Sequence, residues 1–167
     1  MLEDMKQRAG FTIVEVVITL TIMAILVSLA AVNLRSSVTE ANDQERQTDI
    51  SNILLYLDSY YERNNNSYFP TSAASSPAQI ETWFTNIDRG NLRAPSIAAP
   101  DYSLVAATNP IQTTAGVLPK PTKTTYIYQS LDSAGVLCTA IPNCRKVNIY
   151  YLRESDNTVQ KVMSKNQ

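Results

Sequence analysis

The chain has 167 residues, enough for one membrane-length segment and one small domain with a modest core. Its 14 Lys and Arg residues nearly balance 15 Asp and Glu residues, so the net charge of −1 predicts no bulk attraction to nucleic acid or anionic lipid. The absence of His removes the commonest general base and metal ligand, which argues against a hydrolase or a metalloenzyme. We therefore expect no catalytic residues, no metal site and no cofactor.

Residues 11–34 form an apolar run that contains a single charge, Glu15. A helix rises about 1.5 Å per residue and a bilayer core is about 30 Å thick, so the run is long enough to span a membrane. Ionisable residues are costly inside such a segment, and Glu15 is therefore a candidate functional residue. The short leader before the run and the cysteine pair far beyond it favour an N-terminus in the cytoplasm and a domain outside.

Two ordinary interpretations of this run each leave a feature unexplained. Ser28-Leu29-Ala30 matches the small-residue cleavage pattern of a secretory signal peptide. However, the apolar core of such a peptide is usually about 7–15 residues long, and Glu15 would interrupt it. A plain single-pass anchor accounts for the length of the run, but not for Glu15 or for the Gly10-Phe11 junction.

The sequence Gly10-Phe11-Thr12-Ile13-Val14-Glu15 resembles the processing site of type IV pilins and type II secretion pseudopilins. In those proteins a short charged leader ends in Gly, and Phe followed by Thr-x-x-Glu opens a long apolar helix. The resemblance is strong over residues 6–63 and weak beyond. It implies that residues 1–10 are a leader, that a prepilin peptidase cleaves between Gly10 and Phe11, and that the same enzyme N-methylates Phe11.

Cleavage at this junction would create the second half of an assembly contact. The new Phe11 amine and Glu15 would lie one helical turn apart, at a helix end where the dipole favours a carboxylate. In a filament core, Glu15 of one subunit would pair with the Phe11 amine of the next, and losing one partner of such a desolvated pair costs about 3–5 kcal/mol. Many pilins carry a helix-breaking Pro in this segment, whereas residues 11–69 here contain neither Gly nor Pro, so no kink is predicted.

Residues 11–63 are predicted to form one helix, with a transmembrane and filament-core segment at 11–34 and an amphipathic continuation at 35–63. Apolar residues recur with helical spacing near its end and form one stripe that would hold the rest of the domain: Ile50, Ile53, Leu54, Leu57 and Tyr61. The charges before this stripe are expected to mark a solvated face: Glu40, Asp43, Glu45, Arg46 and Asp49. Asparagines at 64–66 are expected to end the helix, because Asn tolerates the left-handed cap geometry.

Residues 64–167 are predicted to form a globular head. Seven of the eight prolines fall in residues 70–121, which indicates a loop region over 64–123. Residues 77–88 are the exception, a predicted short helix with Ser76 as its cap, Pro77 in its first turn and Trp83 in the core. A short strand is predicted at 102–106. A C-terminal sheet over 124–167 is predicted from strands at 124–130, 146–153 and 158–163, the last two joined by a turn at 155–157.

Cys138 and Cys144 lie just before the second of these three strands. Two cysteines close in sequence, on the far side of a membrane segment, predict a disulfide in an oxidising compartment. The rival interpretation is a metal site, but two thiolates without His or a further Cys cannot complete a tetrahedral shell. The resemblance also implies a disulfide here, since pilins often staple their C-terminal region with a cysteine pair.

The fold class implied by the resemblance is α+β, the type IV pilin fold. One long N-terminal helix, membrane-spanning in its first half, would pack on a small antiparallel sheet with a C-terminal disulfide. The implied function is structural and not enzymatic. The precursor would wait in the cytoplasmic membrane, and after cleavage an assembly ATPase and an inner-membrane platform protein would extract copies into a helical homopolymer on the cell surface. Its role would be adhesion, twitching motility, DNA uptake or protein secretion.

Three alternatives stay open. One is a pseudopilin of a type II secretion or DNA-uptake pseudopilus. Another is a minor tip pilin whose loops hold DNA or a surface ligand, although the basic residues of that region are scattered: Arg89, Arg93, Lys120 and Lys123. The third is an extracytoplasmic enzyme on a membrane anchor, for which the sequence offers no nucleophile–base pair, metal cluster or phosphate loop.

Overall fold

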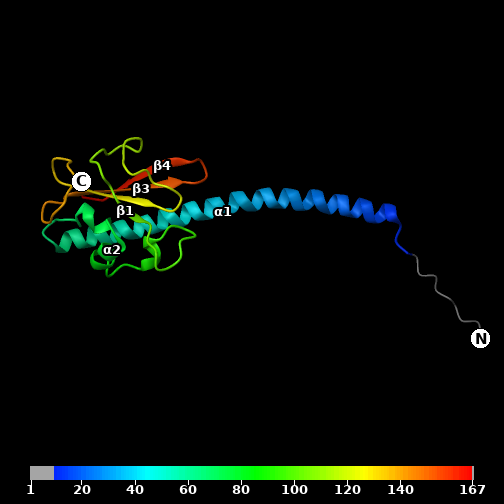
Figure 1. The fold of residues 1–167 in the computed structure, drawn as a ribbon, viewed down its shortest axis with the longest axis horizontal. Coiled ribbons are helices and arrows are strands. Elements are labelled where there is room, and N and C mark those ends of the chain that lie inside the picture. The colour runs from blue at the N-terminus through cyan, green and yellow to red at the C-terminus, as the bar shows by residue number, and fades with distance from the viewer. Residues whose placement is uncertain (1–9, 167) are drawn as a thin grey trace, which may run out of the picture. The chain divides into compact units, whose positions relative to one another are not determined.

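The computed structural model describes residues 10–166, with the backbone alone described at residues 30–33. The predicted leader therefore lies outside the described residues, apart from Gly10. The chain divides into two compact units, Met1–Val38 and Thr39–Gln167. Figure 1 shows the elements, which follow one another as α1 (Ile13–Arg63), η1 (Thr71–Ala74), α2 (Pro77–Trp83), η2 (Arg89–Leu92), β1 (Leu104–Ala106), β2 (Tyr126–Leu131), β3 (Lys146–Arg153) and β4 (Thr158–Met163).

Helix α1 begins at Ile13, so Phe11 and Thr12 precede it instead of opening it as the sequence predicted. The reason is local, because the Thr12 hydroxyl accepts a hydrogen bond of 3.2 Å from the Glu15 N–H and so caps the first turn. The helix then continues for 51 residues, as expected for a stretch without Gly or Pro. It ends in the predicted asparagine turn, where Asn65 and Asn66 have φ angles of 51° and 57°.

The sheet has four strands in the order β1-β2-β3-β4. Strands β2, β3 and β4 pair antiparallel, and a tight turn that contains Asn157 at a φ of 54° joins the last two as predicted. Strand β1 pairs parallel to β2, with Leu104 opposite Tyr126, so the whole sheet is mixed. The antiparallel sheet predicted at 124–167 is present, and β1 adds an edge strand whose parallel pairing was not predicted. A long connection between β1 and β2 returns the chain to its starting end, which permits a parallel pair where a hairpin would not.

Both faces of the sheet are covered, which explains why every residue of β2 is buried. Tyr126 and Tyr128 point into the main core with the α1 stripe, in which Ile50, Ile53 and Leu57 are fully buried. Ile127 points the other way, into a smaller cluster with Val117 and Tyr150. The predicted stripe therefore holds α1 against the sheet.

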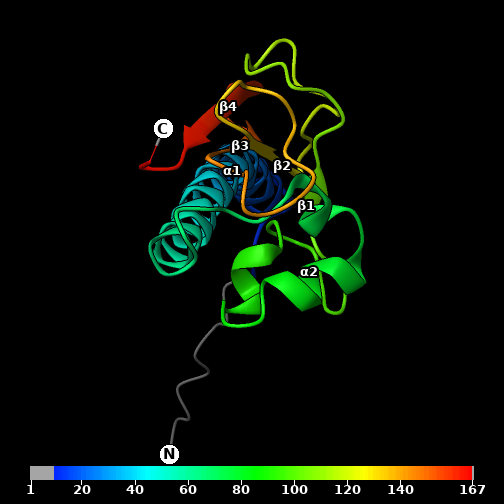
Figure 2. The same cartoon turned by 90° about the vertical axis from the view of Figure 1, so that its left-hand side faces the viewer.

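Helix α2 is shorter than predicted and lies beside the last turns of α1 (Figure 2), where the Tyr56 hydroxyl donates to the Trp83 carbonyl at 3.3 Å. Ser76 caps it as expected by accepting from the Gln79 N–H. It ends at Trp83 because Phe84 leaves helical geometry and inserts its ring into the core. Trp83 itself is half-buried at the edge of the core instead of lying inside it.

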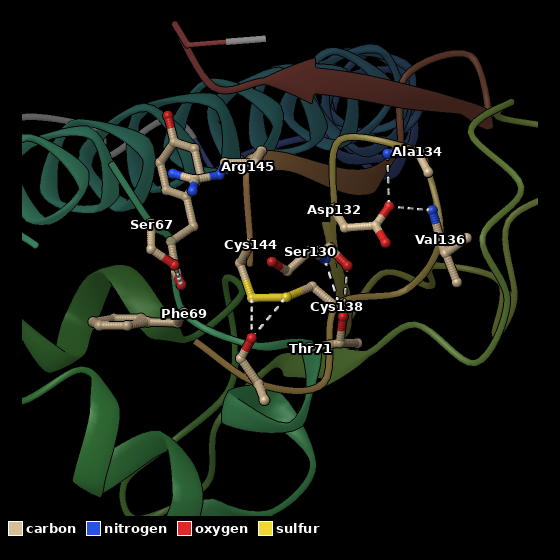
Figure 3. The surroundings of a disulfide bond; sticks show 12 residues. Ser67, Phe69, Thr71, Ser130, Asp132, Ala134, Val136, Cys138, Cys144 and Arg145 are labelled. Carbon is tan, nitrogen blue, oxygen red and sulfur yellow. Dashed lines mark hydrogen bonds between the residues drawn. A yellow bond between two sulfur atoms is a disulfide. The ribbon is translucent and has the colours of Figure 1, made fainter. Parts of the chain in front are cut away.

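The predicted disulfide between Cys138 and Cys144 is present, with Cα atoms 5.3 Å apart (Figure 3). The backbone carbonyls of the two cysteines accept hydrogen bonds from the segment that follows α1. The Tyr68 N–H donates to the Cys144 carbonyl at 2.9 Å, and the Thr71 N–H donates to the Cys138 carbonyl at 2.8 Å. The Thr71 hydroxyl also donates to the Ser130 carbonyl of β2 at 2.8 Å. The cross-link therefore fixes a turn that joins residues 68–71 to the sheet.

Candidate functional site

The described part of the first unit presents an apolar surface that its own chain does not cover. Every side chain described from Phe11 to Leu29 is exposed, including Phe11 and Ile13 at 84% each. Within the described residues, α1 is the one helix long and apolar enough to cross a membrane, with a mean hydropathy of 2.6 in its most apolar stretch. So much apolar surface is costly in water and requires lipid or other protein molecules around it.

The hydroxyl groups along this surface are satisfied by the helix itself. Thr19, Thr21 and Ser28 each donate to a carbonyl three or four residues earlier, at 2.7 to 2.9 Å. This internal bonding allows the segment to enter an apolar environment without orphaned donors.

Glu15 is different from these hydroxyl residues. Its carboxylate makes no hydrogen bond and no ion pair with any residue that the structure describes, and it lies in the first turn of α1. The helix dipole favours a negative charge there but supplies only part of what a desolvated carboxylate needs. The geometry therefore leaves Glu15 available for a partner from another molecule.

Gly10, Phe11 and Glu15, the residues predicted for cleavage, methylation and assembly, are all exposed and lie together at the start of α1. Gly10 has open space around its Cα, since a methyl group added there would meet no atom within 4 Å beyond its chain neighbours. Cleavage at this junction and a contact between Phe11 and Glu15 of neighbouring subunits stay predictions.

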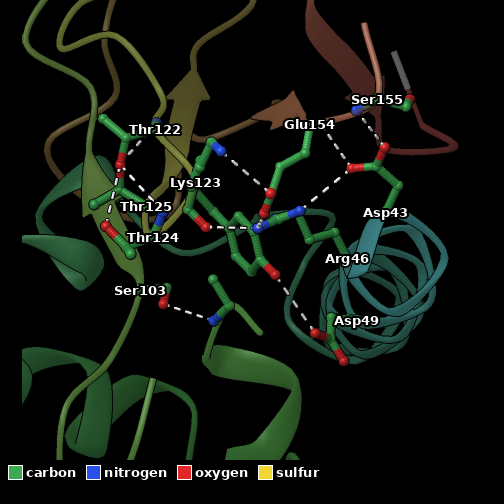
Figure 4. A network of polar contacts seen from close by, with 12 residues as sticks. Asp43, Arg46, Asp49, Ser103, Thr122, Lys123, Thr124, Thr125, Glu154 and Ser155 are labelled. Carbon is green, nitrogen blue, oxygen red and sulfur yellow. Dashed lines mark hydrogen bonds and ion pairs between the residues drawn. The ribbon is translucent and has the colours of Figure 1, made fainter. Parts of the chain in front are cut away.

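A second polar site, which sequence reasoning missed, lies in the other unit around Arg46 (Figure 4). This side chain is only 1% exposed. Its guanidinium pairs with Asp43 at 3.3 Å and with Glu154, and it donates to the Lys123 carbonyl at 2.8 Å. Lys123 completes the network through its own contact of 3.4 Å with Glu154. The network therefore joins α1 to Lys123, which precedes β2, and to Glu154, which follows β3.

Asp43 binds the β3–β4 turn directly. Its carboxylate oxygens accept hydrogen bonds from the backbone N–H groups of Glu154 at 2.7 Å and Ser155 at 2.9 Å. The prediction of a solvated charged face is therefore wrong for Asp43, Arg46 and Asp49, which the head covers. The spacing of Asp43 and Arg46 indicates a possible pair within the helix, but nothing in the sequence connects Arg46 with Glu154, 108 residues away.

The charges of this network shift the pKa values of its acids. Burial acts to raise the pKa of Asp43, but the two turn N–H groups and Arg46 outweigh it and hold that pKa below its ordinary value. Burial likewise opposes ionisation of Glu154, and Arg46 and Lys123 lower its pKa. Asp49 is not part of the ion pairs of the Arg46 network. Burial and the charge of Glu45 raise the pKa of Asp49 to about 6, although the Tyr126 hydroxyl, 3.5 Å away, acts against this.

The basic residues considered for nucleic-acid binding are engaged within the head. Arg89 pairs with Glu81 at 3.8 Å, and Arg93 donates to the Asp101 carbonyl at 3.0 Å. Lys123 belongs to the Arg46 network. No group of three or more Cys, Asp or Glu residues in the described part of the chain is placed to hold a metal ion. Within the described residues, Arg89, Arg93 and Lys123 are therefore engaged by neighbouring groups of the head instead of being free for phosphates.

Comparison with known proteins supports the interpretation of the N-terminal part. Residues 5–31 match the family described as the prokaryotic N-terminal methylation motif. The chain is 33% identical over 92 residues to the type II secretion system core protein G of Vibrio cholerae serotype O1. The matched region covers 55% of this chain and 61% of that relative. No solved structure matches the chain significantly.

An exposed apolar helix, a mixed sheet held on its last turns and a disulfide in the head together define a pilin-like α+β protein. The methylation motif and the relative from Vibrio support placing the chain in the family of type IV pilins and type II secretion pseudopilins.

Proposed function

We propose that this chain is a structural subunit, not an enzyme, that polymerises into a type IV pilus-like filament after a prepilin peptidase cleaves it between Gly10 and Phe11. Before assembly, residues 11–34 anchor the precursor in the inner membrane, with the N-terminus in the cytoplasm. An assembly ATPase and an inner-membrane platform protein then move copies of the chain from the membrane into a cell-surface filament. The head, residues 64–167, faces outward.

The observation that carries this proposal is the contrast between an uncovered apolar helix and one uncompensated carboxylate at its start. A plain membrane anchor needs the apolar surface but has no use for Glu15, whose carboxylate lacks a partner in the described part of the chain. A helical polymer uses both. Apolar packing alone permits neighbouring helices to slide along one another, whereas a pair between Glu15 and the next subunit's Phe11 amine selects one axial position.

Mass spectrometry of the mature N-terminus tests the proposal directly. We expect a chain that begins at Phe11 and carries a methyl group on its α-amine. An intact Met1 would support a plain anchor, and a chain beginning at Ala31 would support a signal peptide; either result contradicts the proposal. As a matched pair, Gly10→Val should block cleavage because the peptidase needs a small residue there, whereas Gly90→Ala should leave cleavage unchanged.

A second candidate function is that of a pseudopilin, and the similarity to a type II secretion core protein favours it specifically. A pseudopilin would use the same cleavage and the same Glu15 contact in a short periplasmic filament. A strain of the host that lacks this protein distinguishes the two functions. Loss of surface filaments with normal export of proteins supports the pilus, and loss of protein export without loss of surface filaments supports the pseudopilus.

A further inference from the structure

A hollow of about 410 Å³ lies at the end of α1, wholly within the second unit. It is lined by the last turns of α1, by Phe69 on the returning chain, and by the end of α2 with the residues that follow it. Its size falls in the range of about 300–1,000 Å³ that small-molecule sites occupy. None of its lining residues belongs to the Arg46 network or to the exposed apolar part of α1.

Aromatic rings form the walls of this hollow, and internal contacts hold them in place. Phe69, only 1% exposed, lies between Tyr60 and Trp83, whose ring centroids are 4.2 and 5.2 Å from its own. The Trp83 ring N–H donates to Gln79 at 3.1 Å, and the Tyr56 hydroxyl donates to the Trp83 carbonyl. Both Tyr60 and Trp83 are half-buried and line the hollow, so the chain does not fully cover either residue. The aromatic surface is therefore built before any ligand arrives.

Polar groups at the rim are left without partners. Within the described residues, no hydrogen bond is made by the Tyr60 hydroxyl, by the Thr85 hydroxyl or by the Asn86 amide, all of which line the hollow. Burial raises the pKa of Tyr60, which keeps its hydroxyl protonated and able to donate. The rim thus combines hydroxyl and amide groups that both donate and accept.

Arg63 is the one charged residue among those that line the hollow. Ser59 holds its guanidinium through Nε and one terminal nitrogen, at 3.0 Å each, and the other terminal nitrogen has no partner in the described part of the chain. The one acid of α2, Glu81, is engaged by Tyr102 at 3.1 Å and by Arg89. The lining therefore carries one positive charge, which complements one anionic group.

We propose that this hollow is a carbohydrate site that takes an acidic sugar of the hexuronate class. A pyranose ring presents a face of C–H groups, which suits the electron-rich faces of Tyr60 and Trp83, and a rim of hydroxyls, which suits the free groups of Thr85 and Asn86. Its carboxylate would accept from Arg63 in a charge-assisted hydrogen bond. A nucleic acid is a poorer match because one cation cannot compensate a run of phosphates.

Trp83 supplies the measurement, because it is the only Trp in the chain and it lies in the site. The full chain is kept in phosphocholine micelles, whose head group is not a sugar, and titrated with trigalacturonate while Trp fluorescence is recorded. We expect a saturable change, and binding of neutral cellotriose at least about tenfold weaker because it lacks the carboxylate. The assay needs no filament, so its outcome is separate from that of the proposed function.

Matched variants locate the binding. Tyr60→Phe and Arg63→Gln should each weaken trigalacturonate binding several-fold or more, whereas Tyr61→Phe and Arg89→Gln, outside the lining, should leave it unchanged, with circular dichroism showing that all four fold. The proposal is overturned if trigalacturonate gives no saturable change, if cellotriose binds equally well, or if the control variants lose binding as much as the test variants. A hexaproline peptide that saturates the signal where trigalacturonate does not would also overturn it.

Discussion

The two parts of α1 differ in whether the rest of the chain covers their apolar side chains. In its first part, up to Val38, the described side chains are exposed, and most of them are apolar. In its last part, Ile50, Ile53 and Leu57 are fully buried against the head. The burial energy of the last part therefore belongs to the fold of a single chain, whereas that of the first part is available only when lipid or other subunits surround it.

The charged residues of the two parts likewise differ in whether their own chain supplies a partner. Both terminal nitrogens of the Arg46 guanidinium have partners from the same chain, two carboxylates and a carbonyl, which compensate most of the cost of its burial. Glu15 has no such partner in the described residues. Removing one partner of a charge that is paired within its own chain destabilises the subunit, whereas a charge left open at the end of an apolar helix is suited to specify how subunits meet.

The largest expected effect is on assembly. Glu15→Leu should reduce filament yield by more than about 100-fold, because the Phe11 amine of the neighbouring subunit would then be buried without a partner, at a cost of about 3–5 kcal/mol. Membrane insertion and cleavage should be unchanged. Sheared filaments and membrane-bound subunits are quantified by immunoblot. Glu62→Leu, an exposed acid near the other end of α1, is the control, and a normal filament yield from Glu15→Leu would contradict the assembly contact.

The next effect is on the stability of the head. Arg46→Met should lower the free energy of unfolding by about 3–5 kcal/mol, because it leaves Asp43 and Glu154 partly buried without their cation. Urea denaturation of the full chain in phosphocholine micelles measures this change. Arg89→Met, which removes a cation that is 64% exposed, should cost less than about 1 kcal/mol. Equal losses in the two variants would show that the Arg46 network contributes no special stability.

A smaller effect is expected from the disulfide. Replacing Cys138 and Cys144 together by Ser should lower the free energy of unfolding of the head by about 2 kcal/mol, as expected for so short a loop. The first part of α1 makes no use of this cross-link, so membrane insertion should not change. The same urea assay, with and without a thiol reductant, gives the value. A wild-type chain that reductant does not destabilise would contradict the prediction.

The smallest effect depends on pH. An Asp carboxyl in an unfolded chain has a pKa of about 3.9, and that of Asp49 in the folded chain is about 6. The folded state binds the proton more tightly, so this group makes the free energy of unfolding fall as pH rises from about 4 to 6, after which it is level. This difference in pKa corresponds to an upper limit of about 3 kcal/mol. Because solvent screening reduces it and Asn keeps only part of the contacts of a neutral carboxyl, Asp49→Asn should gain about 1–2 kcal/mol over the wild type at pH 7.5 and little at pH 4.

Asp43 and Glu154 act in the opposite direction to Asp49. Their pKa values are lowered in the folded state, so the stability that they contribute is present above about pH 4 and is lost as pH falls through the folded values. Because Asp49→Asn keeps both groups, the difference between variant and wild type at the two pH values isolates Asp49. An identical difference at pH 4 and pH 7.5 would contradict the raised pKa.

Local patterns predicted most of the elements correctly. The long helix, its asparagine cap, the apolar stripe over residues 50–61 and strands β3 and β4 follow from helical or alternating periodicity and from turn residues. The early end of α2 and the parallel pairing of β1 were not predicted. The end of α2 depends on how Phe84 packs into the core, and the pairing of β1 depends on the position of β2. Periodicity carries no information about either, because both are contacts with residues distant in the sequence.

The candidate sites also differ in whether consecutive residues or distant residues form them. By itself, the sequence determined the methylation motif, the apolar run and the isolation of Glu15 within it, because these are properties of consecutive residues. Only the tertiary structure decided that Arg46 is buried, since its partner Glu154 is 108 residues away, and that Trp83 lies at the edge of an aromatic hollow instead of in the core. A charge pattern shows which residues need partners, whereas the folded chain shows which of them find a partner within the same molecule.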